Sequence, residues 1–270
     1  MGKASASCPS YVTGVFCIAA GDAPGAGFAI DKKLTTTVSA ASGRTTIFIN
    51  GSESPAPVSK AVMRRFVEKC GRMGIVEIRH EAEVPIGFGL GMSAAGALSL
   101  SLALNEFLGA GLGREECVKI AHDSDVECGT GLSGVDAAAV GGILVRRSLS
   151  KEVVRLPFEE KEIEIAFFSP IRNAAVLKSR EWQGRVNAAG EKALGALSED
   201  RNWDGFVAAS RQFAKESLLA DWCKPEMEKN SRASMAMLGQ TLFSDMPLDI
   251  RRRPKVLIKA KTSEGGAELL

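Results

Sequence analysis

PIGFGLGMSAA, residues 85–95, is the most distinctive stretch of this 270-residue chain. Alternating glycines let a backbone turn tightly and approach a ligand without a Cβ clash. Residues 75–84 alternate apolar and polar side chains, which predicts a strand. From Ser93 onward the side chains are small and apolar on every face, which predicts a buried helix. A strand, a glycine loop and a helix in this order offer unpaired helical N–H groups to a phosphate.

The loop therefore predicts a phosphate cradle that needs little help from lysines. Neither common nucleotide fingerprint is present. The Rossmann fingerprint G-x-G-x-x-G is not met, because Gly91 is followed by Met92, Ser93 and Ala94, and the Walker pattern is not met, because no G-K-[ST] appears. The alternative is that the glycines only let the helix pack closely on a sheet. The residues predicted to hold the nucleotide are Pro85, Gly87, Gly89, Leu90, Gly91, Met92, Ser93, Ala94 and Ala95.

Composition excludes several classes of function. With 45% hydrophobic and 24% charged residues, the chain has the composition of a folded globular protein. The 34 basic and 32 acidic residues leave a net charge of +2, which provides no large field for nucleic acid. Residues 84–104 carry no charge, but the glycines and Pro85 leave a helix of only about 12 to 15 residues, too short to span a bilayer. We therefore expect neither a nucleic-acid nor a membrane partner.

The rare residues narrow the chemistry further. The six cysteines form no C-x-x-C pair, and the two histidines form no H-E-x-x-H helix, so no zinc or thiol redox motif is visible. Scattered cysteines favour a reducing compartment, and the N-terminus lacks the basic flank of a signal peptide. We expect a cytoplasmic protein.

The hydropathy pattern predicts an α+β chain with two domains, residues 1–155 and 156–270. A charged, loop-like stretch near residue 155 suggests the boundary. The expected strands cover residues 4–20 (with a turn at Pro9-Ser10), 34–40, 44–51, 75–84, 162–170 and 255–261, and the expected helices cover 58–73, about 93–108, 114–126, 178–197 and 203–220.

Three motifs give the chain a resemblance to the GHMP kinases, the superfamily of galactokinase, homoserine kinase and mevalonate kinase. Residues 85–95 resemble the second signature of that superfamily. Residues 129–142, GTGLSGVDAAAVGG, resemble its glycine/serine segment with an acid before paired glycines, and residues 234–243, SMAMLGQTLF, resemble its C-terminal motif. The resemblance implies an N-terminal domain like the second domain of ribosomal protein S5, a ferredoxin-like C-terminal domain, the use of ATP with Mg²⁺, a small-molecule substrate and a possible homodimer.

Within the superfamily, the start of the chain (SASCPSYVTGVF, residues 5–16) and the C-terminal motif are most similar to archaeal pantoate kinases. This resemblance implies phosphorylation of (R)-pantoate to 4-phosphopantoate in coenzyme A biosynthesis. The sequence departs from that group at Ser10-Tyr11, where a Gly-His pair is usual. Two alternatives stay open: a kinase for another small alcohol (homoserine, mevalonate or shikimate), and a non-catalytic nucleotide-binding regulator.

Asp136 is the candidate catalytic residue. It is the one acid in residues 129–145, and a buried acid is costly without a partner, so we expect a polar or cationic group beside it. The resemblance implies that Asp136 orients or deprotonates the attacking hydroxyl. The alternative is an N-cap for the helix that follows.

The remaining candidates bind metal or substrate. Magnesium prefers oxygen ligands, and the candidates are Ser93 with either Asp125 or Glu127; the resemblance favours Asp125, eleven residues before Asp136. The substrate candidates are Ser10 and Thr13 by their place in the first motif, Arg146 for a substrate carboxylate (with Arg147 and Arg172 as alternatives), and Gly239 for close backbone approach.

Overall fold

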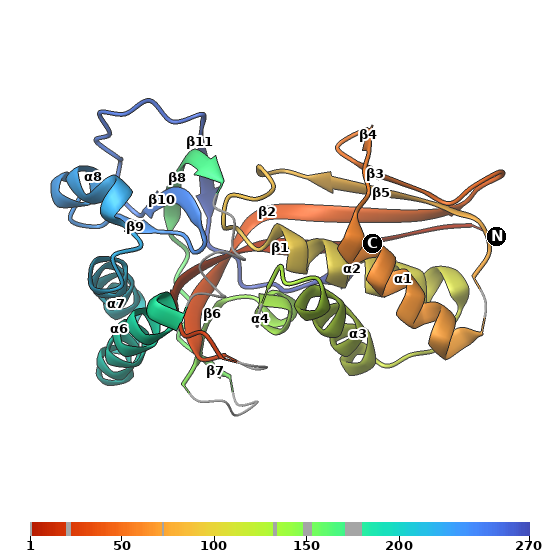
Figure 1. Ribbon diagram of the computed structural model, residues 1–270, viewed down its shortest axis with the longest axis horizontal. Coiled ribbons are helices and arrows are strands. Elements are labelled where there is room, and N and C mark those ends of the chain that lie inside the picture. The colour runs from red at the N-terminus through yellow and green to blue at the C-terminus, as the bar shows by residue number, and fades with distance from the viewer. Residues whose placement is uncertain (1, 20–22, 72, 132–133, 148–152, 171–179) are drawn as a thin grey trace.

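The computed structural model describes residues 2–19, 23–71, 73–131, 134–147, 153–170 and 180–270. Two lobes lie side by side along the longest axis (Figure 1). Each lobe combines an antiparallel or mixed sheet with helices, as the α+β pattern predicts.

The first lobe is built on two long strands, β1 (Lys3–Phe16) and β2 (Gly25–Ala40), which pair antiparallel along their length. The sheet runs in the order β12-β1-β2-β5-β3-β4, with β6 and β7 added where β2 continues past β5. The other strands of this sheet are β3 (Thr46–Ile49), β4 (Ser52–Glu53), β5 (Val76–Ala82), β6 (Ile143–Arg146), β7 (Val154–Arg155) and β12 (Glu268–Leu269).

Helices cover one face of this sheet (Figure 1). They are α1 (Pro57–Cys70), α2 (Met92–Leu108), α3 (Arg114–Glu127) and α4 (Gly134–Val140). The central helix α2 packs on β1 and β2 and touches α1, α3 and α4. Eleven of its seventeen residues are buried, which explains why its sequence is apolar on all faces. Among the described residues, no helix is long and apolar enough to cross a membrane.

The second lobe is a four-stranded sheet in the order β11-β8-β10-β9. Its strands are β8 (Glu162–Pro170), β9 (Ser234–Met235), β10 (Gly239–Ser244) and β11 (Val256–Lys261), and its helices are α6 (Arg180–Glu199), α7 (Trp203–Glu216), η1 (Asp221–Cys223) and α8 (Lys224–Lys229). Helix α7 begins where predicted because Asn202 caps it, accepting the Gly205 N–H at 2.8 Å.

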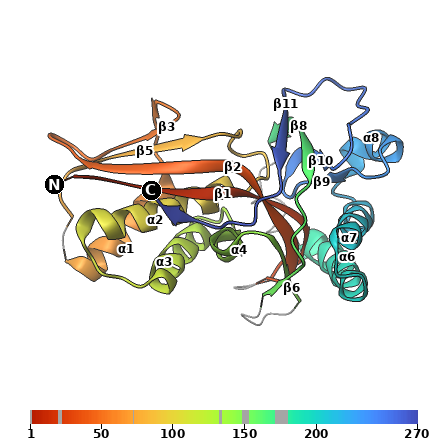
Figure 2. The ribbon, with the colours of Figure 1, turned by 180° about the vertical axis from the view of Figure 1, so that it is seen from behind.

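An aromatic cluster joins the two lobes. Phe28 of β2 meets Trp203, Phe206 and Phe243 edge-to-face, with ring centroids 5.1 to 5.5 Å apart. Such pairs add about 0.5–1.5 kcal/mol each beyond the area they bury. The end of the chain also returns to the first lobe, where β12 pairs with β1 (Figure 2). The two lobes are therefore held together by packed side chains and a returning strand, and not only by the chain that links them.

Two local expectations differ from the structure. The predicted turn at Pro9-Ser10 is a β-bulge inside one continuous strand, because β1 keeps its pairing with β2 on both sides. Asp136 is the third residue of α4, not its cap, since the helix already begins at Gly134. The domain boundary near residue 155 stays a prediction; the strands divide between the two sheets there, except for β12.

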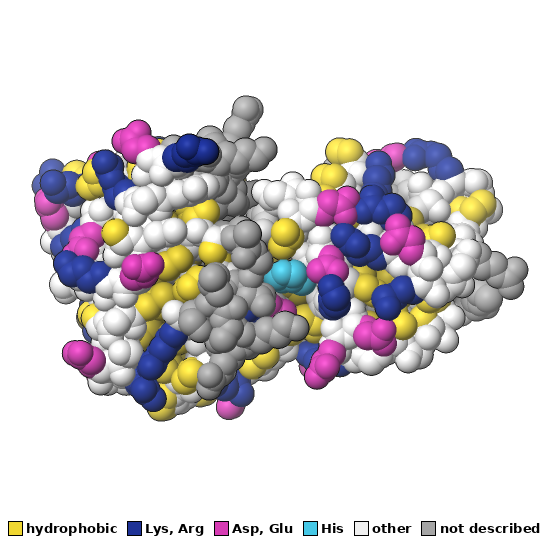
Figure 3. Space-filling model, turned by 60° about the horizontal axis from the view of Figure 1, so that its bottom comes forward, with side chains coloured by type: hydrophobic (Ala, Val, Ile, Leu, Met, Phe, Trp, Pro, Cys, Tyr) yellow, Lys and Arg dark blue, Asp and Glu magenta, His cyan; other side chains and the backbone are white. Residues whose placement is uncertain are grey.

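The surface charge agrees with the composition. On the face drawn in Figure 3, basic and acidic side chains lie interspersed over both lobes. This arrangement gives that face no continuous basic stripe of the kind that tracks a nucleic-acid backbone.

Candidate active site

The glycine loop connects β5 to α2 and holds a conformation that only glycine adopts without strain. Gly87, Gly89 and Gly91 have φ angles of 86°, 87° and 67°. Helix α2 starts directly after Gly91, and no side chain caps its first turn. Its first free N–H groups therefore face outward from the loop, as an anion site requires.

The loop is packed against the C-terminal motif of the second lobe. A Cβ on Gly89 would lie 2.8 Å from the Gly239 nitrogen, and a Cβ on Gly239 would lie 2.0 Å from the Phe88 carbonyl oxygen. The Thr241 hydroxyl donates to the same Phe88 carbonyl at 2.7 Å. The glycine loop and the C-terminal motif, about 150 residues apart in the chain, thus hold each other in position through contacts with the backbone. We expected Gly239 to admit a substrate; the structure places the Phe88 backbone there.

A cavity of about 700 Å³ opens beside the loop. Seven of the nine predicted nucleotide-binding residues line it, whereas Pro85 and Ala95 do not; Thr13 also lines it. Another part of the lining is an apolar wall on and near α1, formed by Leu34, Ile49, Pro55, Pro57 and Val58. No lysine or arginine is among the described residues of the lining, so backbone N–H groups are the main positive charges there.

Three oxygen-bearing side chains converge at the start of α2. The Ser93 hydroxyl donates to Asp125 Oδ1 at 2.5 Å and lies 2.9 Å from the Thr130 hydroxyl, which itself donates to Asp125 Oδ1 at 2.5 Å. Asp125 is 2% exposed, and burial raises the pKa of its carboxyl against the opposing effect of these hydrogen bonds. A Cβ on Gly131 would lie 2.1 Å from Asp125 Oδ2, so a larger residue there would displace this carboxylate.

Glu127, the competing candidate for magnesium, is not brought to this cluster. Its carboxylate is exposed and bonds Arg64 at 2.6 Å and Arg65 at 2.8 Å on the outer side of α1. Two residues along a helix turn the side chain by about 200° from Asp125, which explains why one acid faces the cavity and the other faces solvent. Thr130 is the oxygen that the sequence analysis missed; its place between two glycines five residues after Asp125 was the available signal.

Asp136 has the cationic partner that its apolar surroundings predicted. Arg146 Nη2 lies 3.1 Å from Asp136 Oδ2, and His122 Nδ1 lies 3.7 Å from the same oxygen. The Arg146 side chain is 7% exposed and that of Asp136 is 29% exposed, so the pair is anchored inside while the carboxylate keeps access to solvent. The structure thus joins the predicted catalytic acid to the predicted substrate arginine.

The other substrate candidates are Ser10, Arg147 and Arg172, and neither Ser10 nor Arg147 is among the described residues of the cavity lining. Ser10 is fully buried in β1, outside the cavity lining, and its hydroxyl finds no partner among the described residues. Arg147 is exposed. Arg172 lies outside the described residues.

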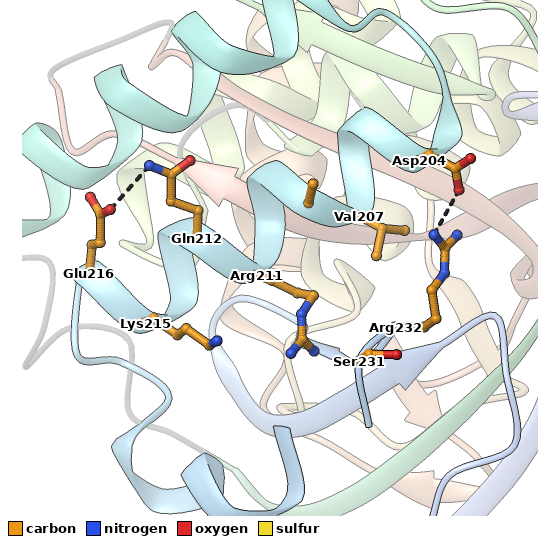
Figure 4. Close-up of a pocket in the computed structure, with 9 residues that line it drawn as sticks. Asp204, Val207, Arg211, Gln212, Lys215, Glu216, Ser231 and Arg232 are labelled. Atoms are coloured by element: carbon orange, nitrogen blue, oxygen red, sulfur yellow. Dashed lines mark hydrogen bonds and ion pairs between the residues drawn. The ribbon is translucent and has the colours of Figure 1, made fainter. Parts of the chain in front are cut away.

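A second hollow lies along α7, and both arginines that line it, Arg211 and Arg232, are already engaged (Figure 4). Arg211 donates to the carbonyl oxygens of Met227, Asn230 and Ala233. Arg232 is paired with Asp204 and Asp245. These groups hold the fold together, so the cavity beside the glycine loop is the stronger candidate.

Comparison with known proteins agrees with this geometry. Residues 58–142 match the sequence profile of the GHMP kinases N terminal domain. A pantoate kinase from Methanocaldococcus jannaschii is 30% identical over 253 residues, covering 87% of this chain and 90% of the relative. The chain belongs to the GHMP kinase superfamily. A pantoate kinase from Methanospirillum hungatei is 26% identical over 260 residues, 90% of this chain and 87% of the relative.

Solved structures confirm the predicted α+β GHMP kinase fold. A phosphotransferase related to the CoA biosynthesis pathway matches with a TM-score of 0.80 and 22% identity, over 99% of this chain and 98% of that one. A homoserine kinase from Cytophaga hutchinsonii matches with a TM-score of 0.70 and 15% identity, over 100% of this chain and 98% of that one. In this GHMP kinase, the glycine loop, Asp125 and the C-terminal motif therefore meet on a known scaffold.

Proposed function

We propose that this GHMP kinase transfers the γ-phosphoryl group of ATP, with Mg²⁺, to the hydroxyl of (R)-pantoate, giving 4-phosphopantoate and ADP. The observation that carries the phosphoryl-transfer part is the uncapped start of α2 beside Ser93, Thr130 and the buried Asp125. The similarity to two pantoate kinases over nearly the whole chain supports the choice of acceptor.

The loop contributes positioning and charge neutralisation, which phosphoryl transfer needs more than covalent chemistry. The first N–H groups of α2 would hold phosphate oxygens, and the glycines would let those oxygens approach the backbone. No lysine or arginine among the described residues lines the cavity. A triphosphate beside the Asp125 carboxylate would therefore meet like charge unless a cation lay between them.

The donor set near Asp125 fits magnesium. Hydroxyl and carboxylate oxygens of Ser93, Asp125 and Thr130 are hard ligands of the type that Mg²⁺ takes, alongside water and phosphate. Nowhere in the described ranges do three or more His, Cys, Asp or Glu side chains gather as a metal cage, so phosphate oxygens would complete the ligand set. When bound, the metal supplies charge neutralisation on the transferred group.

Asp136 and Arg146 would handle the acceptor. The Asp136 carboxylate would accept a hydrogen bond from the attacking hydroxyl and take its proton as the new P–O bond forms. Arg146 holds that carboxylate at 3.1 Å and brings a guanidinium suited to a substrate carboxylate.

A coupled ADP-release assay tests the proposal. With ATP and Mg²⁺, (R)-pantoate should turn over faster than homoserine, mevalonate or shikimate by at least about a hundredfold in kcat/KM, because an unpaired polar group in a substrate site is strongly rejected. Faster turnover of another alcohol would replace pantoate as the acceptor. Binding of ATP without turnover of any of the four would favour the non-catalytic regulator.

A further inference from the structure

A buried chain of hydrogen bonds crosses the first lobe behind the cavity. Ser59 in the first turn of α1 lies 2.9 Å from Nε2 of His80 on β5, and Nδ1 of the same ring lies 2.8 Å from the Thr36 hydroxyl on β2. Thr36 is 2.5 Å from the Ser99 hydroxyl of α2, which donates to the Ala95 carbonyl at 2.7 Å. All four side chains are buried, and the function described above uses none of them.

The imidazole in this chain is neutral. His80 is 3% exposed, its ring bonds two hydroxyl groups, and burial lowers the pKa of the ring from 6.5 to about 4. A neutral imidazole has one N–H donor and one acceptor nitrogen, so its two hydroxyl partners must play opposite roles.

The far end of the chain determines which nitrogen carries the proton. A carbonyl oxygen only accepts, so the single proton of Ser99 points to Ala95. Thr36 must then donate to Ser99, because two oxygens 2.5 Å apart need a proton between them. The Thr36 oxygen accepts from His80 Nδ1–H, and Nε2 is left as the acceptor for Ser59. The reverse order would leave the Ser99 and Ala95 oxygens 2.7 Å apart with no proton between them.

The Ser59 hydroxyl therefore donates its only proton to His80 Nε2 and can act only as a hydrogen-bond acceptor toward a ligand. Ser59 and His80 both line the cavity, and Ser59 directly follows Pro57 and Val58 of the apolar wall. Such a wall suits a flat, apolar ring with a few polar edges. The sequence pattern gave no sign of this acceptor, because its four members come from four separate elements.

We propose that the Ser59 hydroxyl, oriented by His80, accepts a hydrogen bond from the amino group of a purine base and so selects adenine nucleotides over purines that lack this group. The inference rests on the proposed function only in that a nucleotide occupies the cavity, and it is independent of the acceptor alcohol. Ser59 is the specificity-determining residue and His80 is a positioning residue.

Nucleotide affinity tests the role of Ser59. We expect the wild-type protein to bind Mg·ATP about three- to tenfold more tightly than the triphosphate of purine riboside, which differs by loss of the 6-amino group, as one net hydrogen bond would give. Ser59→Ala should weaken ATP binding by that factor and leave the purine riboside nucleotide unchanged. Ser198→Ala is the matched control, since that hydroxyl lies on α6 outside the cavity lining and donates to the local Gly195 carbonyl.

Several results would overturn the inference. They are equal wild-type affinity for the two nucleotides, equal weakening of both by Ser59→Ala, tighter binding of inosine triphosphate than of ATP, or no binding of any of them. Selective ATP binding without phosphoryl transfer to an alcohol would contradict the proposed function and support the inference. Thermal unfolding midpoints of each variant separate a folding defect from loss of the hydrogen bond.

A spectroscopic measurement tests the proton order directly. The chain has two histidines, so a long-range ¹H–¹⁵N spectrum should contain two ring systems, of which His80→Gln removes one. We expect that ring to be the neutral Nδ1–H form at pH 7. A neutral Nε2–H form would reverse the direction of the chain, and an imidazolium would donate from both ring nitrogens. In either case Ser59 would accept from His80 and keep a proton for the ligand, which would refute the proposal.

Discussion

Replacing Gly89 with alanine should break the contact between the glycine loop and the second lobe. The new Cβ would lie 2.8 Å from the Gly239 nitrogen and the Leu238 carbonyl carbon, and 2.9 Å from the Ala236 oxygen. All three are backbone atoms, so no side chain can swing away. The residue would also keep a φ of 87°, which alanine rarely adopts.

Gly87 provides the comparison that isolates the contact. Its φ is 86°, but a Cβ there would meet only the Pro170 Cβ at 3.7 Å, an ordinary distance. Backbone strain costs about 1–3 kcal/mol at either position. Overpacking adds about 1–3 kcal/mol at Gly89 alone. We therefore expect Gly89→Ala to lower the free energy of unfolding by about 2–6 kcal/mol and Gly87→Ala by about 1–3 kcal/mol.

Urea unfolding followed by tryptophan fluorescence measures both variants. Gly195→Ala serves as a control, because this glycine lies in α6 with open space around it and alanine should stabilise the helix by about 0.5–1 kcal/mol. Nucleotide affinity should fall with Gly89→Ala, since the loop loses the support of residues 236–239. If Gly89→Ala and Gly87→Ala were equally stable, the close packing of loop and motif would be refuted.

Three further outcomes follow from Asp125, Asp136 and His80. Asp125→Asn should abolish the rise in thermal midpoint that Mg·ATP gives the wild type, and it should lower turnover by about a hundredfold or more, because the metal loses a carboxylate ligand. The free protein should not be destabilised, since the substitution removes a buried charge. An unchanged midpoint rise would contradict this prediction. Asp136→Asn should reduce kcat by about 10²–10⁴-fold in the ADP-release assay while nucleotide affinity stays constant, and full activity would exclude proton transfer. Stability should fall between pH 6.5 and pH 4 because unfolded His80 binds a proton that the folded ring resists; a pKa lowered from 6.5 to about 4 corresponds to about 3 kcal/mol. Urea midpoints of His80→Gln should lose this part of the pH dependence, and an identical pH profile would show that His80 does not carry it.

Local patterns in the sequence were enough to place most elements. The glycine spacing predicted the loop, and the helix from Ser93 was recognisable because small apolar residues on every face suit a helix enclosed by its neighbours. The lone acid at Asp136 predicted a partner by the cost of burying an unpaired charge, and the structure supplies Arg146. Both inferences depend on interactions within a few residues or on a general energetic rule.

Contacts between residues far apart in the chain could not be predicted from the sequence. The choice between Asp125 and Glu127 depends on which face of α3 turns inward, and that orientation follows from packing on α1 and α2. The same limit applies to the contact of Gly239 with Phe88 and to the chain from Ser59 to Ser99, whose partners lie up to about 150 residues apart. Local propensity specifies an element, whereas the meeting of distant side chains depends on how the whole chain closes around one core, because each such contact is stabilised only when the others have formed.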